Sequence, residues 1–346
     1  MAAITYDGQS FMVDGRRIWL VAGSLEYTRI PRDDWADRLV AAKHAGLNAI
    51  TTSVIWSRHE SRPGQFDFTG HADLRYFLEL VKAAGLYCSL RIGPFVGGSF
   101  DLGGLPPWLL SNPNITLRTA NGPFLEACSR FIGAVAKQVR DLQATVPQPE
   151  RDQVGPIVLV QNEQQWTCGH EVLAHGYLGE LDRYLRESGF EVPFCNANDL
   201  WQGVEGEIDC WAGSGPMLAN LRQLAVVRPS QPRLVASYRL GEPAWWGGPA
   251  VKPMEPDSLQ RGLCEILAAG AQFSVEPLAA GTNFGFLAGR STVGPDRFFS
   301  TSDDANAPVG ESGAVRPNYH ALRRVAMCAS RFGRLLAHLD PKRQAV

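Results

Sequence analysis

The residues best suited to chemistry are polar side chains that directly follow short apolar runs of the sequence. Carboxylates occur there repeatedly, and a well-placed carboxylate can act as a general acid, a general base or a nucleophile. Each of them also has a structural interpretation, in which it pairs with a nearby arginine and orders a loop. The polar residues and segments in question are Glu26, Ser53, His59 with Glu60, 91–101, 161–165, 196–199, 237–242 and 276–283.

Three other kinds of site lack residues that they require. Residues 93–98 (GPFVGG) have neither the glycine spacing nor the following Lys-Ser/Thr of a phosphate-binding loop. His59-Glu60 lacks the second histidine of an HExxH zinc motif, and the seven cysteines never stand in CxxC spacing. No G-x-S-x-G elbow surrounds Ser237, which argues against an acyl-transfer triad. The sequence therefore predicts no metal ion and no cofactor.

Tryptophans are concentrated in the same strand-end segments. Any one of them is readily explained by packing, but a group of flat aromatic rings offers the surfaces on which sugar rings stack. This grouping favours a carbohydrate ligand. The tryptophans are Trp56, Trp108, Trp166, Trp201, Trp245 and Trp246.

Short apolar runs alternate with longer stretches whose apolar residues recur every three or four positions. The runs are typical of buried parallel strands and the longer stretches of amphipathic helices. Over 346 residues, repeated strand–helix units favour an α/β fold of the (β/α)8 (TIM barrel) type, with a doubly wound sheet as the alternative. The expected strands are 18–22, 49–54, 87–92, 157–161, 234–237 and 272–275, and the expected helices are 35–45, 73–84, 124–142, 177–187, 259–269 and 319–336.

No linker rich in Pro, Gly or Ser divides the chain, so a single domain over 1–346 is expected. A short strand or hairpin would occupy 1–17 and the barrel about 18–340. In this fold the active site lies at the C-terminal ends of the strands and on the loops that follow. The polar segments named above stand at those places.

The charge balance argues against two classes of partner. Lys and Arg number 33 against 35 Asp and Glu, a formal net charge of −2, which leaves no basic surface for nucleic acid or an anionic membrane. No apolar run is long enough to span a bilayer, and residues 1–15 lack the regions of a secretory signal. The scattered cysteines indicate reduced thiols. We therefore expect a cytoplasmic protein.

Several segments together resemble the catalytic barrel of glycoside hydrolase family 35, the β-galactosidases. The resemblance implies a (β/α)8 barrel, which the strand–helix alternation favours independently, and a carbohydrate ligand. Members of this family usually continue into C-terminal β-domains, so one expectation to be tested is that such domains are missing here. A homo-oligomer is a second expectation. The segments are 23–29 (GSLEYTR), 46–50 (GLNAI), 63–68 (PGQFDF), 91–95 (RIGPF), 103–110 (GGLPPWLL), 155–157 (GPI) and 281–285 (GTNFG).

The acid/base motif of the family is altered in this sequence. After Gly-Pro-Ile, family members carry Q-V-E-N-E-Y, whose second Glu is the general acid/base. An ungapped alignment places Glu163 on the first Glu of that motif. Gln164 and Gln165 then fall on the Asn and on the catalytic Glu. A one-residue deletion would instead make Asn162 and Glu163 the catalytic pair, but it would change which face of the strand each neighbour uses.

The nucleophile's segment is altered as well. Residues 232–248 resemble the family pattern P-x-x-x-T-E-Y-x-x-G-W-x-x-x-W-G-G, and Ser237 occupies the position of the nucleophilic Glu. Glu242 replaces an aromatic residue five positions later. Retaining glycosidases need one carboxylic acid to protonate the leaving oxygen and one carboxylate to attack the sugar. Gln165 cannot supply a proton, and an unactivated Ser237 is a poor nucleophile.

Positions that hold the sugar in the family have changed in the same way. Ser53 stands for the Tyr of T-Y-V-x-W, and Ser99 stands for the Glu of C-A-E-W. Glu276 lies in the segment that replaces a tyrosine-bearing strand before G-T-N-F-G. The residues expected to contact a carbohydrate are Ser53, Trp56, Ser99, Gln164, Trp166, Trp246 and Asn283.

The sequence leaves three functions open. The first is a carbohydrate-active barrel that has lost or altered ordinary β-galactoside hydrolysis, because the family catalytic positions hold Gln165 and Ser237. The second is an active retaining hydrolase in which Glu163 is the acid/base and Glu242 or Glu276 is the nucleophile, acting on galactose or another sugar. The third is a structural or interaction module whose barrel mouth is filled by tryptophans.

Overall fold

The core of the protein is one continuous ladder of parallel strands. The computed structural model describes residues 4–97, 99–146, 154–166, 171–198, 200, 202–291, 297–302 and 305–337. Its main sheet has the strand order β10-β11-β12-β4-β5-β6-β7-β8-β9, and all neighbouring pairs in it are parallel. The strands are β4 (Val21–Ser24), β5 (Ala49–Ser53), β6 (Tyr87–Gly93), β7 (Ile157–Asn162), β8 (Phe194–Asn196), β9 (Ile208–Asp209), β10 (Trp211–Gly213), β11 (Leu234–Arg239) and β12 (Gln272–Glu276).

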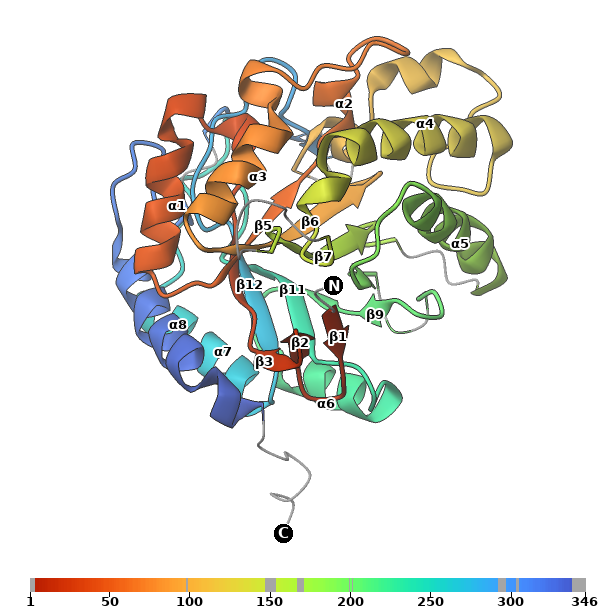
Figure 1. Ribbon diagram of the computed structural model, residues 1–346. Helices are drawn as coiled ribbons and strands as arrows, with labels where there is room; N and C mark the ends of the chain where they lie inside the picture. Colours follow the sequence, from red (N-terminus) through yellow and green to blue (C-terminus); the bar gives the residue numbers. More distant parts are fainter. Residues whose placement is uncertain are drawn as a thin grey trace.

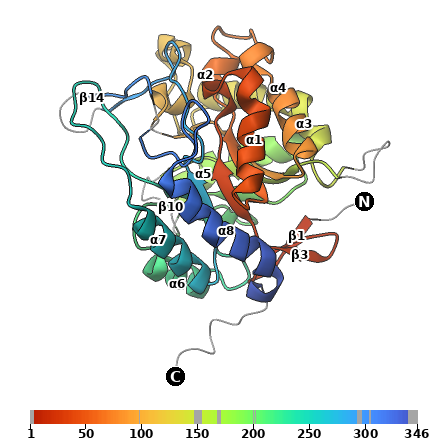
Figure 2. The same ribbon diagram turned by 90° about the vertical axis from the view of Figure 1, so that its left-hand side faces the viewer.

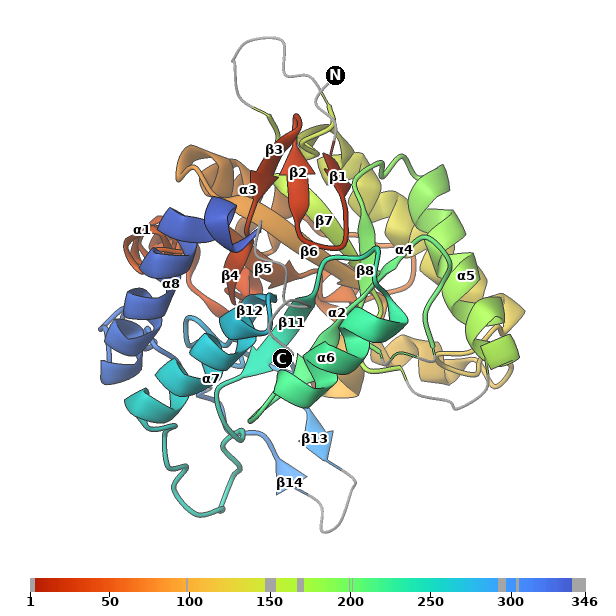
Figure 3. The ribbon, with the colours of Figure 1, turned by 90° about the horizontal axis from the view of Figure 1, so that it is seen from below.

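Strands β9 and β10 close this ladder into a barrel. Only Cys210 separates them in the sequence, and β9 pairs with β8 whereas β10 pairs with β11. The Cys210 amide also donates to the Asn196 carbonyl at 3.0 Å, so the two short strands act as one strand interrupted at a single residue. Seen from below, helices surround the strands (Figure 3). The predicted single-domain (β/α)8 barrel is confirmed.

The longer helices cover the outside of the barrel, where each buries apolar residues against the strands (Figure 1). In α3, Leu74, Phe77 and Val81 are fully buried, and the Asp73 side chain caps the helix by accepting from the Tyr76 amide at 3.0 Å. The helices are α1 (Trp35–His44), α2 (Trp56–His59), α3 (Leu74–Ala83), α4 (Gly122–Val139), α5 (Glu171–Glu187), α6 (Leu218–Val227), α7 (Pro256–Ala268) and α8 (Pro317–Leu336), with 3-10 turns at Tyr27–Arg29, Arg32–Asp34, Gly70–Ala72, Asp101–Gly104, Pro107–Ser111 and Arg140–Leu142.

Two small antiparallel sheets lie on opposite sides of the barrel (Figure 2). β1 (Ile4–Tyr6), β2 (Phe11–Val13) and β3 (Arg16–Ile18) form the first, in which buried Phe11 packs with Leu20 and other residues at the N-terminal ends of the barrel strands. β13 (Arg290–Ser291) and β14 (Arg297–Phe298) form the second, in a loop that reaches the C-terminal ends. The first sheet therefore covers the bottom of the barrel.

Most predicted elements agree with the structure to within a few residues, and the differences have simple causes. The strand expected at 18–22 is displaced, because Ile18 ends β3 and the barrel strand begins only at Val21. Helix α5 begins six residues before the predicted start at 177. Strands β8 to β10 were not predicted as elements, because they are only two or three residues long and carry little periodicity. Helix α6 was not predicted either.

The described part of the chain shows no helix with both the length and the hydropathy to cross a membrane. The cysteines of the described residues are free thiols, and Cys168 lies outside that part of the chain. The buried thiols are Cys88, Cys128, Cys195 and Cys210, and the exposed ones are Cys264 and Cys328.

Candidate active site

A cavity of about 770 Å³ opens at the C-terminal ends of the barrel strands. The strands contribute polar side chains to its wall, and the loops contribute aromatic rings. Trp245 lines it and stacks on Phe299 with 4.3 Å between the ring centroids. A concave space of this size, with aromatic and convergent polar groups, suits a small ligand such as a sugar. The charged residues that line it are Glu26, Arg29, Arg118, Arg239, Glu242, Glu276 and Arg290.

Arg91, at the end of β6, organises the floor of this cavity. The side chain is fully buried, and its Nη2 pairs with Glu276 Oε2 at 3.2 Å. Its Nε donates to Gln161 Oε1 and its Nη1 to the Val96 carbonyl, each at 3.2 Å. Nη1 also lies 3.5 Å from the Ser53 hydroxyl. One cation thus ties together the polar ends of β5, β6, β7 and β12.

Glu26 lies beside Arg91 and is held by Ser53. Its Oε2 accepts from the Ser53 amide at 3.0 Å, and its Oε1 accepts from the Ser53 hydroxyl at 2.8 Å. Burial raises the pKa of Glu26, and the charge of Glu276 raises it further, although Arg91 acts in the opposite direction. Glu26 is therefore a carboxyl group that keeps its proton to a higher pH than an ordinary glutamate.

The surroundings of Glu276 have the opposite effect. Burial acts to raise the pKa of Glu276, but the charge of Arg91 and the hydrogen bonds from Ser237 and Arg91 outweigh it, so the pKa is lowered. The side chain keeps 28% of its surface exposed and lines the cavity. Two carboxyl groups in one site whose pKa values are moved apart can take the roles of acid and of base or nucleophile.

Gln165 and Ser237 line the same cavity. Gln165 follows β7 with a left-handed φ of +52°, and its amide donates to the Ala197 carbonyl at 3.1 Å. Ser237 lies within β11, and its hydroxyl contributes to the lowered pKa of Glu276. These two positions therefore present an amide and a hydroxyl group to a bound molecule, and neither presents a carboxylate of its own.

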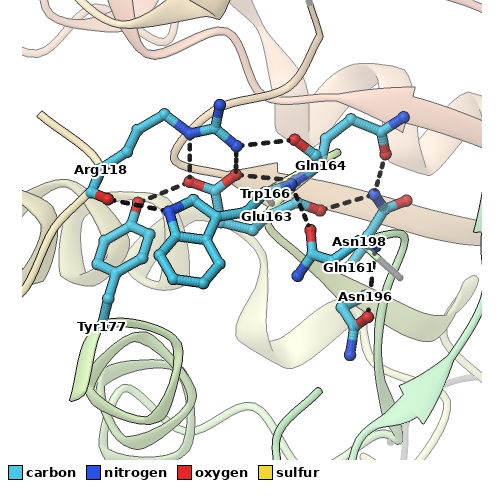
Figure 4. Close-up of polar contacts among 8 residues, drawn as sticks. All are labelled: Arg118, Gln161, Glu163, Gln164, Trp166, Tyr177, Asn196 and Asn198. Carbon is cyan, nitrogen blue, oxygen red and sulfur yellow. Dashed lines mark hydrogen bonds and ion pairs between the residues drawn. The ribbon is translucent and has the colours of Figure 1, made fainter. Parts of the chain in front are cut away.

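Glu163 is fully buried beside Arg118 and Gln164, which both line the cavity (Figure 4). Arg118 binds both of its oxygens, from Nε at 3.2 Å and from Nη2 at 2.8 Å. The Tyr177 hydroxyl donates to Oε1 at 2.6 Å and the Gln164 amide to Oε2 at 2.9 Å. Glu163 is not among the residues that line the cavity. Its carboxylate fixes the loop after β7 and positions Arg118 in the cavity wall.

Comparison with known proteins identifies the family of this barrel. The sequence profile described as "Glycosyl hydrolases family 35" matches residues 10–328. The chain belongs to this family. A β-galactosidase from Canis lupus familiaris is 32% identical over 332 residues, which cover 93% of this chain and 48% of that protein. A β-galactosidase from Homo sapiens is 32% identical over 335 residues, with 94% and 48% covered. The chain thus spans about half the length of these relatives.

Solved structures share the fold of this family-35 chain at low sequence identity. A β-galactosidase from Marinomonas ef1 superposes with a TM-score of 0.66 at 11% identity, covering 93% of this chain and 62% of that one. The exo-β-1,4-mannosidase Op5Man5 from an Opitutaceae bacterium does so with a TM-score of 0.66 at 14% identity, covering 95% and 62%. Both likenesses support the barrel architecture.

The structure brings several of the residues singled out in the sequence to one cavity and leaves others elsewhere. Ser53 lies in the floor under Glu26. Trp56 is fully buried against Phe131, with 4.8 Å between the ring centroids. These two residues are not among those that line the cavity. The predicted residues that line it are Gln165, Ser237, Glu242, Glu276, Ser99 and Gln164.

Three further residues predicted to contact sugar lie outside the cavity lining. Trp166 is buried and donates from its indole to the Arg118 carbonyl at 2.9 Å. Trp246 is 67% exposed beside the lining residue Trp245. Asn283 is buried and donates to the Ser300 carbonyl at 2.9 Å. Their sugar-binding roles stay predictions, and Trp201 lies outside the described residues.

Sequence reasoning missed part of the cavity. Glu26 was noticed only as a polar residue after a strand, and its place beside Ser53 and Arg91 depends on which strands are neighbours. Arg118 comes from a loop with no strand signal, so nothing in the sequence marked it. The described residues contain no cluster of three or more His, Cys, Asp or Glu side chains arranged to hold a metal ion.

Proposed function

We propose that this family-35 barrel binds a carbohydrate in the 770 Å³ cavity and has lost or altered the ordinary hydrolysis of β-galactosides. The observation that carries the proposal is that Gln165 and Ser237, which the alignment with the family motifs puts at its two catalytic glutamates, line one and the same cavity. The ligand pocket is thus retained at the usual place, while the groups at the usual catalytic positions are not acids.

The chemical consequence is large. A glutamine has no proton to give to a leaving oxygen, and a serine attacks an acetal carbon poorly without a base beside it. In a catalytic unit that acts as a whole, removing one member costs on the order of 10⁴ to 10⁶ in turnover. Ser53 and Ser99 also replace the larger side chains that hold the sugar in the family. A β-galactoside should therefore be a poor substrate.

The other two functions receive less support. An acid/base role for Glu163 would need a path from its carboxyl group to the cavity, but Arg118, Tyr177 and the Gln164 amide occupy its oxygens. A purely structural module with a mouth filled by tryptophans does not agree with a cavity of about 770 Å³ that has one tryptophan, Trp245, in its lining.

Calorimetric titration with a panel of monosaccharides and disaccharides tests the proposal, together with hydrolysis of 4-nitrophenyl β-galactoside. We expect at least one sugar to bind and the galactoside to be cleaved far below ordinary enzymatic rates. Trp245→Ala should weaken sugar binding because it removes an aromatic wall of the cavity. The matched control is Phe332→Ala, which removes an exposed aromatic ring on α8. The neighbouring Gly333 packs on Trp19, so this ring lies at the end of the barrel that is far from the cavity. Absence of binding to every sugar, or galactoside turnover at about 1 s⁻¹ or faster, would contradict the proposal.

A further inference from the structure

Glu276 brings a carboxylate to the place that Ser237 leaves without one. Strands β11 and β12 are parallel neighbours, with Arg239 opposite Glu276 in their register. Ser237 and Glu276 line the same cavity, and Ser237 is close enough to contribute to the lowered pKa of the Glu276 carboxyl group. The position on β11 that corresponds to the family's nucleophile therefore shares its cavity with an acidic group from the neighbouring strand.

The contacts of Glu276 suit a nucleophile. Arg91 pairs with one oxygen, Oε2, at 3.2 Å and is itself fixed by Gln161 and Val96. The remaining 28% exposure of the side chain is toward a cavity that Glu276 lines. The group is thus held charged by a buried cation, oriented by two partners and reachable by a bound molecule.

Glu26 lies on the other side of Glu276. Strand β12 also pairs with β4, with Val275 opposite Gly23, so the ends of β4 and β12 are adjacent. Glu26 follows β4, lines the same cavity and interacts electrostatically with Glu276. Burial and the neighbouring charge raise its pKa, as a general acid requires.

We propose that Glu276 and Glu26 form a relocated catalytic pair that hydrolyses a glycoside of a sugar other than galactose. In the first step the Glu276 carboxylate attacks the anomeric carbon, the glycosidic bond breaks, and the proton of Glu26 moves to the leaving oxygen. In the second step Glu26, now a carboxylate, takes a proton from water, whose oxygen attacks the same carbon and releases Glu276. Both residues return to their starting states.

The other carboxylates near the cavity are less well placed for these roles. Glu163 is enclosed by Arg118 and Tyr177 and does not line the cavity. Glu242 lines the rim but has an exposed side chain, so water screens its charge. The sugar is expected to differ from galactose because Ser53 and Ser99 replace the side chains that hold galactose in the family. The inference rests on the proposed function, since a carbohydrate must first occupy the cavity.

Glycosides with good and poor leaving groups separate the two roles. The substrates are phenyl and 2,4-dinitrophenyl β-glycosides of glucose, mannose, xylose, fucose and glucuronic acid, with galactose for comparison. We expect Glu276→Gln to lower kcat at least 10⁴-fold for both leaving groups of the accepted sugar. Glu26→Gln should lower kcat about 10² to 10⁴-fold for the phenyl glycoside but less than tenfold for the dinitrophenyl glycoside, which needs no acid. Glu205→Gln, on an exposed turn, is the matched control and should leave kcat unchanged.

Two further measurements keep a folding defect from imitating the result. Glu276→Asp retains the charge beside Arg91, so it should keep sugar affinity by calorimetry while kcat falls. A 2-deoxy-2-fluoroglycosyl fluoride of the accepted sugar should label the peptide that contains Glu276. Three results would overturn the inference and leave the proposed function standing. They are sugar binding without turnover of any glycoside, labelling of a peptide that lacks Glu276, and a kcat of the Glu276→Gln variant within tenfold of wild type. Absence of sugar binding would overturn the proposed function itself.

Discussion

Replacing Glu163 by glutamine tests whether this residue holds the cavity wall or takes part in chemistry. The substitution keeps the shape of the side chain and removes its charge. In the native protein the two carboxylate oxygens accept from Arg118 at 3.2 and 2.8 Å, from Tyr177 at 2.6 Å and from the Gln164 amide at 2.9 Å. An amide turns one of these acceptors into a donor that faces other donors. It also leaves Arg118 without the carboxylate that neutralises it.

The expected loss of stability follows from burial. Glu163 is 0% exposed, and breaking a buried ion pair by removing one partner costs about 3–5 kcal/mol. The Arg118 side chain is 24% exposed, so water can solvate part of the cation that is left. We therefore expect Glu163→Gln to lower the free energy of unfolding by about 3 kcal/mol, at the lower end of that range.

Urea denaturation at pH 7 measures this loss as a shift of the midpoint at unchanged slope. Arg118→Met should cost a similar amount. The double variant should cost less than the sum by about 1–3 kcal/mol, because the two residues share one interaction. Glu205→Gln is the surface control and should stay within about 0.5 kcal/mol of wild type. If Glu163→Gln is as stable as wild type but loses turnover with KM unchanged, the structural role is refuted and Glu163 is an acid after all.

Two other perturbations have outcomes that follow from burial and charge elsewhere in the barrel. The double substitution Gln165→Glu plus Ser237→Glu restores the family carboxylates and should return little activity on 4-nitrophenyl β-galactoside. The reason is that the new carboxyl group at position 237 would lie beside the like charge of Glu276. A kcat of about 1 s⁻¹ or more would show that only the catalytic groups had been lost. His59 is buried and its pKa is lowered to about 4, with burial as the main cause. The unfolded chain takes up that proton near pH 6.5, so the free energy of unfolding should fall by about 3 kcal/mol between pH 6.5 and 4. Urea denaturation over this range should show the loss in wild type and a much smaller one in His59→Gln.

Much of the barrel could be predicted because buried parallel strands can be recognised from short runs of consecutive apolar residues. Strand β7 is buried at all of its residues, and its first four, Ile157 to Val160, form an unbroken apolar run. Helix α3 shows the spacing of a one-sided apolar stripe and has its capping Asp73 in place. Strands of two or three residues, such as β9 and β10, are too short to be recognised in this way. Their pairing depends on the neighbouring strands between which they lie.

The candidate site was predictable only where a residue's role is tied to a motif. Gln165 and Ser237 could be predicted to share one cavity because family segments stand on both sides of Ser237 and the Gly-Pro-Ile segment precedes Gln165 without a gap. Trp56 was misleading, because an aromatic residue after a strand can face the mouth or the helices, and here it packs on Phe131. Whether a side chain faces the cavity depends on the local turn, which spacing does not determine.

The sequence by itself identified the family-35 barrel and predicted, through an ungapped alignment, that an amide and a hydroxyl stand at the family's two catalytic positions, since residue type and order are all that those statements need. Tertiary structure alone decided which acids remain near the cavity. Glu26 and Glu276 come from opposite ends of the chain and meet because closing the barrel makes β4 and β12 neighbours. Their charge states depend on burial and on Arg91, and burial is a property of the folded molecule.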